Sequence, residues 1–420
     1  MSYFCKKNTM KKTILCMFAL ISALNTTAQN QETISLNPGY THQSFYSMQN
    51  GEIVNIENDN WDLAFSTDSY SANIRINDGK GVELYTYNLG DTSSWSSINN
   101  STPNILTNPM YNSDTSWQYG AFIMNQSSGM FDYGWGVYNI QTHHIVGDSI
   151  FVIKTVNGNW KKLLIETKAS GEYFFKYANL DGSNEINQNI QASNYSDKRF
   201  IYYSLENDLI IDRELALSDW DITFTKYITP VQGMPYSVTG VLSNIGIKIA
   251  QADNVTNPIL YTDYTNHNFD NYINSIGYDW KQFQGSYIIV PNRVYFIKDY
   301  QEQVWRLVFT GFEGSSTGNI EFNAELLSTT STNNSLVKGS LNIFPNPSVN
   351  NQKITIIYDM QKANSISLHD IYGKEIYFSK INKSGFNTYT IDKNKIAKGT
   401  YIVNISNEKG YSITKKLIVY

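Results

Sequence analysis

Two of the chain's five histidines, His143 and His144, stand side by side in the stretch NIQTHHIVGD. Imidazole nitrogens are common ligands of iron and zinc, so this pair is the first candidate for chemistry. If the local chain is extended, adjacent side chains point to opposite faces, and at most one of the two histidines can face a given ligand. The alternative is that both end a strand or begin the turn at Gly147 and Asp148 and bind nothing.

The usual catalytic signatures are missing from the sequence. It contains no H-E-x-x-H zinc helix, no G-x-S-x-G elbow and no phosphate-binding glycine loop. Cys5 and Cys16 are the only cysteines, and both lie in an N-terminal segment that we expect to be removed. Asp62 and Asp221 each follow a tryptophan in matching strands, which favours hydrogen bonding at a strand end over acid–base chemistry. We therefore predict no catalytic residues, no metal site and no enzymatic activity.

The N-terminus, residues 1–28, reads as a secretory signal peptide. Four lysines precede an apolar run over residues 13–24, and small residues up to Ala28 follow it. This run is shorter than the roughly 20 residues that a membrane-spanning helix needs. We expect an exported mature chain from about residue 29, with no transmembrane segment and no disulfide. The sequence leaves open whether Met1 or Met10 is the start.

The last segment, residues 338–420, has the pattern of a small β-sandwich. Tyr401, Val403 and Ile405 alternate with Ile402 and Asn404, as in a strand with one buried face. The segment resembles the C-terminal sorting domain of type IX secretion cargo from the Bacteroidetes. The likeness is carried by these motif residues: Pro345, Asn346, Pro347, Asp370, Ile371, Tyr372, Gly373, Gly399, Thr400, Tyr401, Lys415, Lys416 and Leu417. A carbohydrate-binding sandwich of similar size is the alternative.

The resemblance of the tail implies a route and its partners. The protein would pass through the periplasm to the outer membrane, engage the type IX secretion machinery, and lose the tail to the signal-removing sortase of that system. The product would be secreted or held at the outer-membrane surface, either released or attached to lipopolysaccharide. These partners and this location are what the resemblance implies.

Charge separates the tail from the passenger, the segment that precedes it. Residues 338–420 carry 12 lysines and 5 acids, a net charge of +7, whereas residues 29–337 carry 16 basic and 32 acidic residues, a net charge of −16. Segments of opposite sign are unlikely partners in one folding unit, and the polar run over residues 328–337 is the expected linker. A passenger this acidic disfavours nucleic acid and anionic membrane surfaces as partners.

The passenger sequence contains an internal duplication. The ordered matches pair residues 47–54 with 204–211, 61–65 with 220–224, 73–76 with 244–247, 133–135 with 278–280, 150–154 with 294–298, and Trp160 with Trp305. Only two copies exist, at a spacing far above that of solenoid repeats. This duplication predicts two tandem domains, at residues 29–190 and 191–327.

Each copy has a β pattern. Residues 61–65 and 220–224 alternate, with the tryptophan expected on the same face as the leucine or isoleucine and the phenylalanine. Residues 74–77 and 82–85 also alternate around Asp78-Gly79, which predicts a hairpin. No long segment has helical periodicity. The expected fold class is all-β: two tandem β-domains followed by the small C-terminal β-sandwich.

The passenger resembles the HmuY-like family of secreted or surface haem-binding proteins. Residues 61–65, 134–138, 142–143 and 151–165 carry the likeness, mostly at core and strand positions. The resemblance implies a hand-shaped all-β fold that holds haem between loops, with axial ligands from separate loops. His143 or His144 would be one ligand in the first copy, and the candidates for the other are His42, Met110, Met124 and Met130. The second copy has Tyr287 and Ile288 at the histidine positions, so it lacks this pair.

Three functional hypotheses follow, and the first is preferred. The protein is predicted to be a secreted or cell-surface, non-catalytic binding protein that is exported by type IX secretion and takes up haem in its first domain. The alternative is a surface adhesion or glycan-binding protein that has lost haem, with Trp95 and Trp117 exposed in polar loops to stack on sugars. The third is a hydrolase whose catalytic residues come together only in three dimensions.

Overall fold

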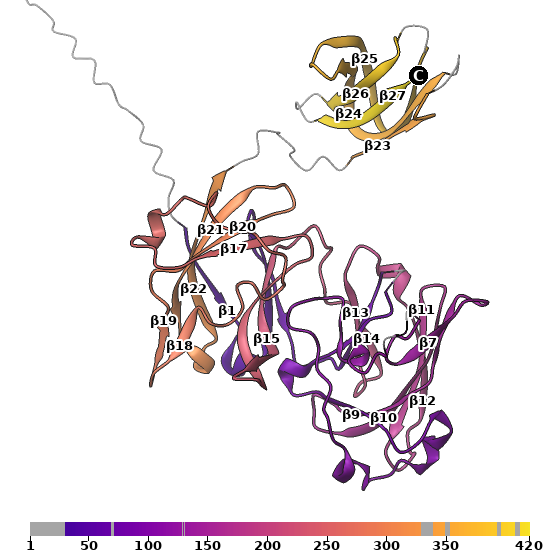
Figure 1. The fold of residues 1–420 in the computed structure, drawn as a ribbon, viewed down its shortest axis with the longest axis vertical. Helices are drawn as coiled ribbons and strands as arrows, with labels where there is room; N and C mark the ends of the chain where they lie inside the picture. Colours follow the sequence, from indigo (N-terminus) through magenta and orange to yellow (C-terminus); the bar gives the residue numbers. More distant parts are fainter. Residues whose placement is uncertain are drawn as a thin grey trace, which may run out of the picture.

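The computed structural model describes residues 30–68, 71–127, 129, 131–328, 339–348, 353–392, 396–407 and 412–420. The predicted signal peptide, Met130 and all of the predicted linker except Ser328 lie outside these residues. Within them the protein consists of strands joined by loops and short 3-10 helices, which confirms the predicted all-β class (Figure 1). None of the described helices has both the length and the apolar character that crossing a membrane requires.

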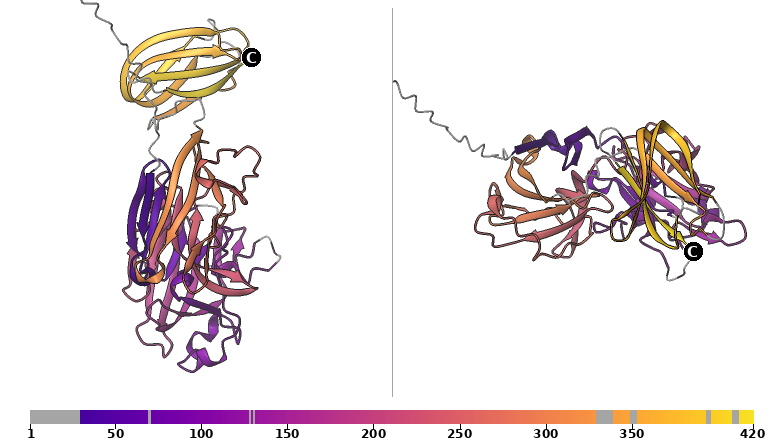
Figure 2. Two further views of the ribbon diagram at one scale, coloured as in Figure 1. Left: turned by 90° about the vertical axis from the view of Figure 1, so that its left-hand side faces the viewer. Right: turned by 90° about the horizontal axis from the view of Figure 1, so that it is seen from above.

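The passenger forms two modules, which lie side by side in Figures 1 and 2. Module I combines a seven-stranded sheet with a four-stranded sheet in the order β14-β13-β4-β5. The seven strands are β6 (Glu83–Thr86), β7 (Gly136–Asn139), β8 (His144–Gly147), β9 (Ile150–Lys154), β10 (Trp160–Ala169), β11 (Glu172–Asn179) and β12 (Ile186–Gln191). The four are β4 (Leu63–Ser66), β5 (Ile74–Ile76), β13 (Phe200–Ser204) and β14 (Leu209–Ile211).

Module II has the same plan. Its five-stranded sheet contains β1 (Asn30–Ser35), β17 (Lys248–Ala252), β20 (Val294–Lys298), β21 (Val304–Phe312) and β22 (Asn319–Ser328). Its four-stranded sheet contains β2 (His42–Ser47), β3 (Gly51–Glu57), β15 (Ile222–Val231) and β16 (Met234–Ser243). A two-stranded ribbon, β18 (Lys281–Phe283) with β19 (Tyr287–Ile289), completes the module.

Short 3-10 helices connect the strands of both modules. They are η1 (Pro38–Tyr40), η2 (Asp78–Lys80), η3 (Thr92–Ser97), η4 (Thr102–Ile105), η5 (Ala121–Ile123), η6 (Ala192–Tyr195), η7 (Pro258–Leu260) and η8 (Gly314–Ser316). Each module has its own apolar core between its two sheets, centred on Trp135 in module I and on Trp280 in module II. These two residues were matched in the sequence, and each occupies the core of its own module.

The two sequence copies exchange their first strands. The hairpin β2–β3 of the first copy pairs with β15 of the second, and the hairpin β13–β14 of the second copy pairs with β4 of the first. Likewise β1 pairs with β22, whereas β12 pairs with β11. Module I is therefore continuous in sequence, and module II joins residues 30–57 to residues 222–328. The expected boundary at residue 190 falls inside β12, so hydrogen bonding groups the strands differently from the repeat.

The paired aspartates hold the exchanged hairpins. Asp62 Oδ2 accepts a hydrogen bond from the backbone N–H of Leu205 at 2.7 Å, and Asp221 Oδ2 accepts one from the backbone N–H of Met48 at 2.7 Å. Each aspartate thus binds the hairpin that the other copy contributes. The predicted structural role of both residues is confirmed.

Several details of the predicted strand alignment are wrong. Trp160 pairs with Lys154, whereas Lys298, the match of Lys154, pairs with Val304, so the match of Trp160 with Trp305 is displaced by one residue. Asn77 and Asn244 are equivalent, because each donates its backbone N–H to the carbonyl oxygen of Asp62 or Asp221, so the match of residues 73–76 with 244–247 is displaced. Residues 78–80 form the buried η2, and the strands on either side of it, β5 and β6, join different sheets instead of forming a hairpin. Sequence alternation suggested one exposed face for each strand, but β5 is buried at all three positions because Arg75 is enclosed as well.

The tail is a separate β unit with its own core. Its strands are β23 (Gly339–Phe344), β24 (Ile354–Asp370), β25 (Glu375–Ile391), β26 (Gly399–Asn407) and β27 (Ser412–Val419), and they pair only with one another among the described strands (Figure 2). Tyr401, Val403 and Ile405 are buried as predicted, whereas Ile402 is exposed. The sheet curls so far that Ser348 forms a bridge with Val419, which makes it nearly closed.

Candidate functional site: a cavity between the two modules

The two four-stranded sheets meet at the junction of module I and module II. Strands β4 and β13 are buried along their whole length, because one face packs in the core of module I and the other faces the junction. Trp61 and Trp220 precede their strands and pack at this junction, Trp61 against Tyr202 and Trp220 against Phe45. The expectation that each tryptophan shares the face of the residues that follow it is therefore wrong, since the strands begin only after Asp62 and Asp221.

A long loop of module I holds the junction together. Trp117 contacts apolar residues of both modules and donates its indole N–H to the backbone oxygen of Ser243 at 2.8 Å. Nearby, Asp114 accepts hydrogen bonds from Thr229 and Asn274 of module II. These contacts fix the two sheets relative to each other.

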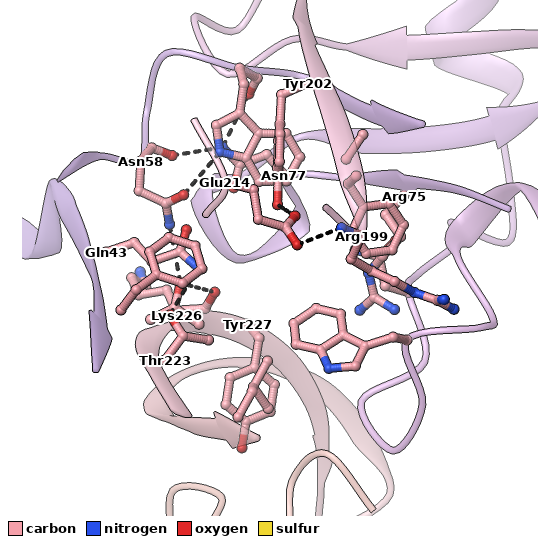
Figure 3. Close-up of a pocket in the computed structure, with 18 of the residues that line it drawn as sticks. Gln43, Asn58, Arg75, Asn77, Arg199, Tyr202, Glu214, Thr223, Lys226 and Tyr227 are labelled. Carbon is pink, nitrogen blue, oxygen red and sulfur yellow. Dashed lines mark hydrogen bonds between the residues drawn. The ribbon is translucent and has the colours of Figure 1, made fainter. Parts of the chain in front are cut away.

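An internal cavity of about 60 Å³ lies between the sheets, which is enough for a few water molecules (Figure 3). Both modules line it, and each supplies aromatic as well as polar side chains. The lining residues used below are Trp61, Arg75, Asp78, Trp117, Arg199, Phe200, Tyr202, Glu214, Trp220, Thr225 and Lys226. Figure 3 shows Arg75, Arg199 and Glu214 on the module I side, across the open space from Tyr227 and Lys226.

Arg75 and Asp78 form a satisfied part of the lining. The Arg75 guanidinium donates to the backbone oxygens of Ser113 and Ser116 at 3.0 Å and lies over the ring of Trp117. Burial lowers the pKa of Arg75 to about 10, with Asp78 opposing the shift. Burial raises the pKa of Asp78 to about 6, and Arg75 opposes that shift. This pair therefore anchors the loop and does not need a ligand.

Glu214 is fully enclosed and also satisfied. Its Oε1 accepts the backbone N–H of Arg199 at 3.0 Å, and its Oε2 accepts the Tyr202 hydroxyl at 2.8 Å. Burial raises the pKa of Glu214 to about 7, although these two hydrogen bonds and the nearby Arg213 oppose the shift. Arg213 itself donates to Gln43 and to the backbone oxygen of Glu57.

Three lining residues have buried donor atoms without a partner among the described residues: Arg199, Trp220 and Tyr227, whose hydroxyl points away from the open space (Figure 3). Arg199 is 7% exposed, and neither its Nε nor its Nη2 finds an acceptor among the described residues. Trp220 is 3% exposed, and its indole N–H has no acceptor in the same part of the chain. The equivalent Trp61 donates its indole N–H to Asn58 at 2.9 Å. Leaving buried donors without partners costs about 1–3 kcal/mol each, so these groups indicate a missing acceptor.

The predicted haem ligands are not at this cavity. His143 is exposed in the turn before β8, with positive φ, and its Nδ1 is 2.7 Å from the Tyr138 hydroxyl. His144 begins β8 and is half-buried. Met130 lies outside the described residues. No group of three metal-ligating side chains is found where the structure is described.

The predicted sugar-stacking tryptophans have partners within the protein. Trp117 is half-buried in the junction, as described above. Trp95 is also half-buried, donates its indole N–H to Glu185 and lies under the ammonium groups of Lys162 and Lys176. Sequence reasoning took both for exposed loop residues because their neighbours are polar.

The cavity residues were missed for a related reason. Arg199, Arg213 and Glu214 lie in short polar stretches that read as solvated loops. The exchange of hairpins brings them against the other repeat, and nothing in the sequence predicts that exchange. The one available signal was the charge next to these strands, because Arg199 directly precedes the buried strand β13, and Arg213 and Glu214 follow shortly after β14.

The sorting motif residues have structural roles in the tail. The Asn346 side chain donates to the backbone oxygen of Lys416 at 2.7 Å and accepts the backbone N–H of Ile418 at 3.0 Å, so it holds the segment after β23 against β27. Pro345 and Pro347 flank it, each after a cis peptide bond.

The other motif residues shape turns and edges. Gly373 has φ of 84° in the turn after β24, where the left-handed conformation favours glycine. Gly399 begins β26, and the Tyr401 hydroxyl donates to the backbone oxygen of Ala397 at 2.8 Å. Lys415 donates to Asn342 at 2.7 Å, and Lys416 is exposed.

Comparison with known proteins identifies the tail. The family described as the secretion system C-terminal sorting domain matches residues 342–420. The protein is thus cargo of the type IX secretion system, and it is secreted or displayed at the cell surface in the Bacteroidetes. Its tail interacts with the type IX secretion machinery.

No curated protein matches the chain. One solved structure, the dimeric latent PorU from Porphyromonas gingivalis, is similar at 10% identity with a TM-score of 0.17. The match covers 83% of this chain and 31% of that one, so this chain spans about a third of its length. A likeness at this level carries no argument about the passenger.

Proposed function

We propose that the exported passenger is a non-catalytic binding protein that holds a small polar ligand in the cavity between module I and module II. The observation that carries this proposal is the pair of buried, unsatisfied donors on Arg199 and Trp220. Ligand sites are commonly apolar and aromatic clefts with a few fixed polar groups, and they often lie at domain interfaces. The cavity has this character, with aromatic side chains from both modules.

A cavity-filling variant tests this proposal. Thr225 lines the cavity and is 6% exposed, so Thr225→Leu should occupy part of the free volume. Protein collected from the culture medium of the native host is unfolded, and released small molecules are identified by mass spectrometry. We expect a compound from the wild type that is absent from Thr225→Leu. Recovery of identical compounds from both proteins contradicts the proposal.

Haem at the β7–β8 hairpin is a second candidate, in line with the resemblance of the first repeat to HmuY-like proteins. The observation that favours it is an apolar outer face on this hairpin. Val137 and Val146 are directly paired and are 45% and 49% exposed, and His144, paired with Asn139, lies on the same face. His144 would be the axial ligand, and His143 would remain bound to Tyr138.

Haemin titration of residues 29–327 tests the second candidate. Haem ligation by His144 gives a sharpened Soret band that His144→Ala weakens and that His143→Ala leaves in place. Met130→Ala tests one candidate for the other axial ligand. An absorbance spectrum equal to that of free haemin at every ratio excludes haem and leaves the junction cavity as the proposed site.

A further inference from the structure

Among the described residues, the unsatisfied groups of the lining are donors on Arg199 and Trp220, together with the Tyr227 hydroxyl, which points away from the open space (Figure 3). The Arg199 Nε and Nη2 and the Trp220 Nε1 can only donate hydrogen bonds. The carboxylates of the lining, in contrast, have their hydrogen bonds made: Glu214 accepts from Arg199 and Tyr202, and Asp78 accepts from Asn112. A ligand that completes this cavity must therefore bring acceptor atoms and needs no donor.

The net charge of the cavity lining determines which acceptor-bearing ligands it favours. The lining includes the cations Arg75, Arg199 and Lys226 and the carboxylates Asp78 and Glu214, with the further cation Arg213 behind Tyr202. Arg75 and Asp78 offset each other. Among the described residues, the Arg199 guanidinium has one ion-pair partner, Asp68, at 3.9 Å, and the side chain of Asp68 is 44% exposed. The cavity is therefore cationic although the passenger as a whole carries a net charge of −16.

Geometry narrows the class further. The free volume of about 60 Å³ fits a ligand of a few heavy atoms better than a nucleotide or a sugar. The planar fork of a guanidinium matches a carboxylate through two parallel hydrogen bonds, and Arg199 has two free donors of that fork, Nε and Nη2. Aromatic rings of Trp61, Trp117 and Phe200 are available beside it for a short apolar group.

From these observations we infer that the junction cavity binds a small organic carboxylate, with Arg199 as its bidentate partner and the Trp220 indole N–H as an additional donor. This inference rests on the proposed binding function and names the chemical class of its ligand. Water molecules that merely satisfy the donors are the alternative that an experiment must exclude.

The test uses the mature full chain from residue 29 with ¹⁵N-labelled tryptophan. The chain has eight tryptophans, and the Trp220 indole signal is assigned with Trp220→Phe. Sodium acetate and its neutral near-isostere acetamide are titrated separately, with sodium chloride at equal ionic strength as the control. We expect acetate to shift the Trp220 signal saturably, and acetamide and chloride to leave it in place.

Variants of neighbouring cations supply the matched comparison. Arg199→Met should weaken acetate binding about tenfold or more, because a charge-assisted hydrogen-bond pair is lost. Lys198→Met removes the same charge one residue away, from a side chain paired with Asp212, and should leave binding unchanged. Arg199→Lys keeps the positive charge but cannot form the two parallel hydrogen bonds of a guanidinium. For every variant, the other indole signals report whether the protein is folded.

The outcomes separate the two proposals. Equal saturable shifts with acetate and acetamide overturn the carboxylate class while the binding function stands. No saturable shift with either probe overturns both, and indicates that the cavity holds water only. Acetate binding that Lys198→Met weakens as much as Arg199→Met places the anion outside the cavity and overturns this inference.

Discussion

At the scale of single residues, the junction between the modules buries several charged side chains. An unpaired charge is most destabilising in such a buried position. Arg75, Arg213 and Glu214 are all less than 8% exposed, yet each is hydrogen-bonded to backbone or side-chain partners. Burial of a charge is tolerated when hydrogen bonds replace water around it. Arg199 departs from this rule, and that departure makes the cavity a binding site in our proposal.

Glu214 makes stability depend on pH. Its pKa rises from 4.5 in the unfolded chain to about 7 in the folded protein. Between these values the folded state holds a proton that the unfolded state has lost, so folding becomes less favourable as pH rises through this window. Glu214→Gln removes this penalty. The variant should therefore gain stability relative to the wild type between pH 5 and pH 8, by up to about 3 kcal/mol.

Urea unfolding at several pH values measures this difference. Glu57→Gln is the control, because its exposed carboxylate carries no burial cost. A stability difference between Glu214→Gln and the wild type that stays constant from pH 5 to pH 8 contradicts the raised pKa of Glu214. Comparing one variant with the wild type cancels the opposite pH dependence of the buried lysines, such as Lys281, whose pKa burial lowers to about 7.

At the scale of elements, the reciprocal exchange of hairpins is the main feature of the passenger. Equivalent strands from the two repeats trade places: β1 and β12 occupy matching edges, and β2–β3 and β13–β14 occupy matching sheets. Each four-stranded sheet combines strands from both sequence copies, so neither copy alone can form it. The four-stranded sheets that face the cavity exist only because of this exchange.

A disulfide pair tests the exchange directly. Gln31 in β1 is the register partner of Asn323 in β22, and the two cysteines of the unprocessed chain, Cys5 and Cys16, precede the predicted cleavage site. Gln31→Cys with Asn323→Cys should therefore form an intramolecular disulfide, since directly opposed strand residues lie within bonding range. Non-reducing electrophoresis of the oxidised protein detects it as faster migration.

The control pair represents strands that stay with their own repeat. Asn323 corresponds to Lys176 in β11, since Ala324 and Tyr177 hold equivalent positions opposite Leu307 and Leu163. Gln31→Cys with Lys176→Cys should remain reduced within one chain. Efficient closure of this pair instead would show that the repeats do not exchange strands.

The sequence predicted that the elements are β-strands and that they are duplicated, but it did not predict which strands pair. The alternation around Leu63 and Phe65 predicts a strand with one core face, and those two side chains do lie in the core of module I. Repeat matching also found Trp135 and Trp280. It could not find the exchange, because two equivalent strands satisfy the same hydrogen-bonding pattern on either sheet, and only tertiary packing decides between them. The cavity depends on that decision, so its residues were not predictable.

At the scale of the whole molecule, module I is a continuous segment and module II is closed by the passenger's two ends. Residues 61–211 contain both sheets of module I and its core. The core of module II combines Ile34 and Tyr46 with residues from Ile222 onward. The folding units are therefore offset from the sequence repeats.

Two fragments of the passenger test whether the folding units are the modules or the sequence repeats. Residues 58–211 should fold alone and unfold cooperatively in urea, monitored by near-ultraviolet circular dichroism. Residues 29–190 end before β13 and should lack fixed tertiary structure, because β4 loses its partner and the core of module I is left open. If residues 29–190 fold and residues 58–211 do not, the repeats are the true units.

The pairing of β1 with β22 also determines when module II can fold during synthesis of the chain. Asn30 meets Ala324, a partner that leaves the ribosome almost three hundred residues later. Contacts so distant along the chain form slowly, because a long loop must close before they stabilise anything. Until residue 324 has been synthesised, β1 therefore has no strand partner in β22, and module II cannot close before nearly the whole passenger exists.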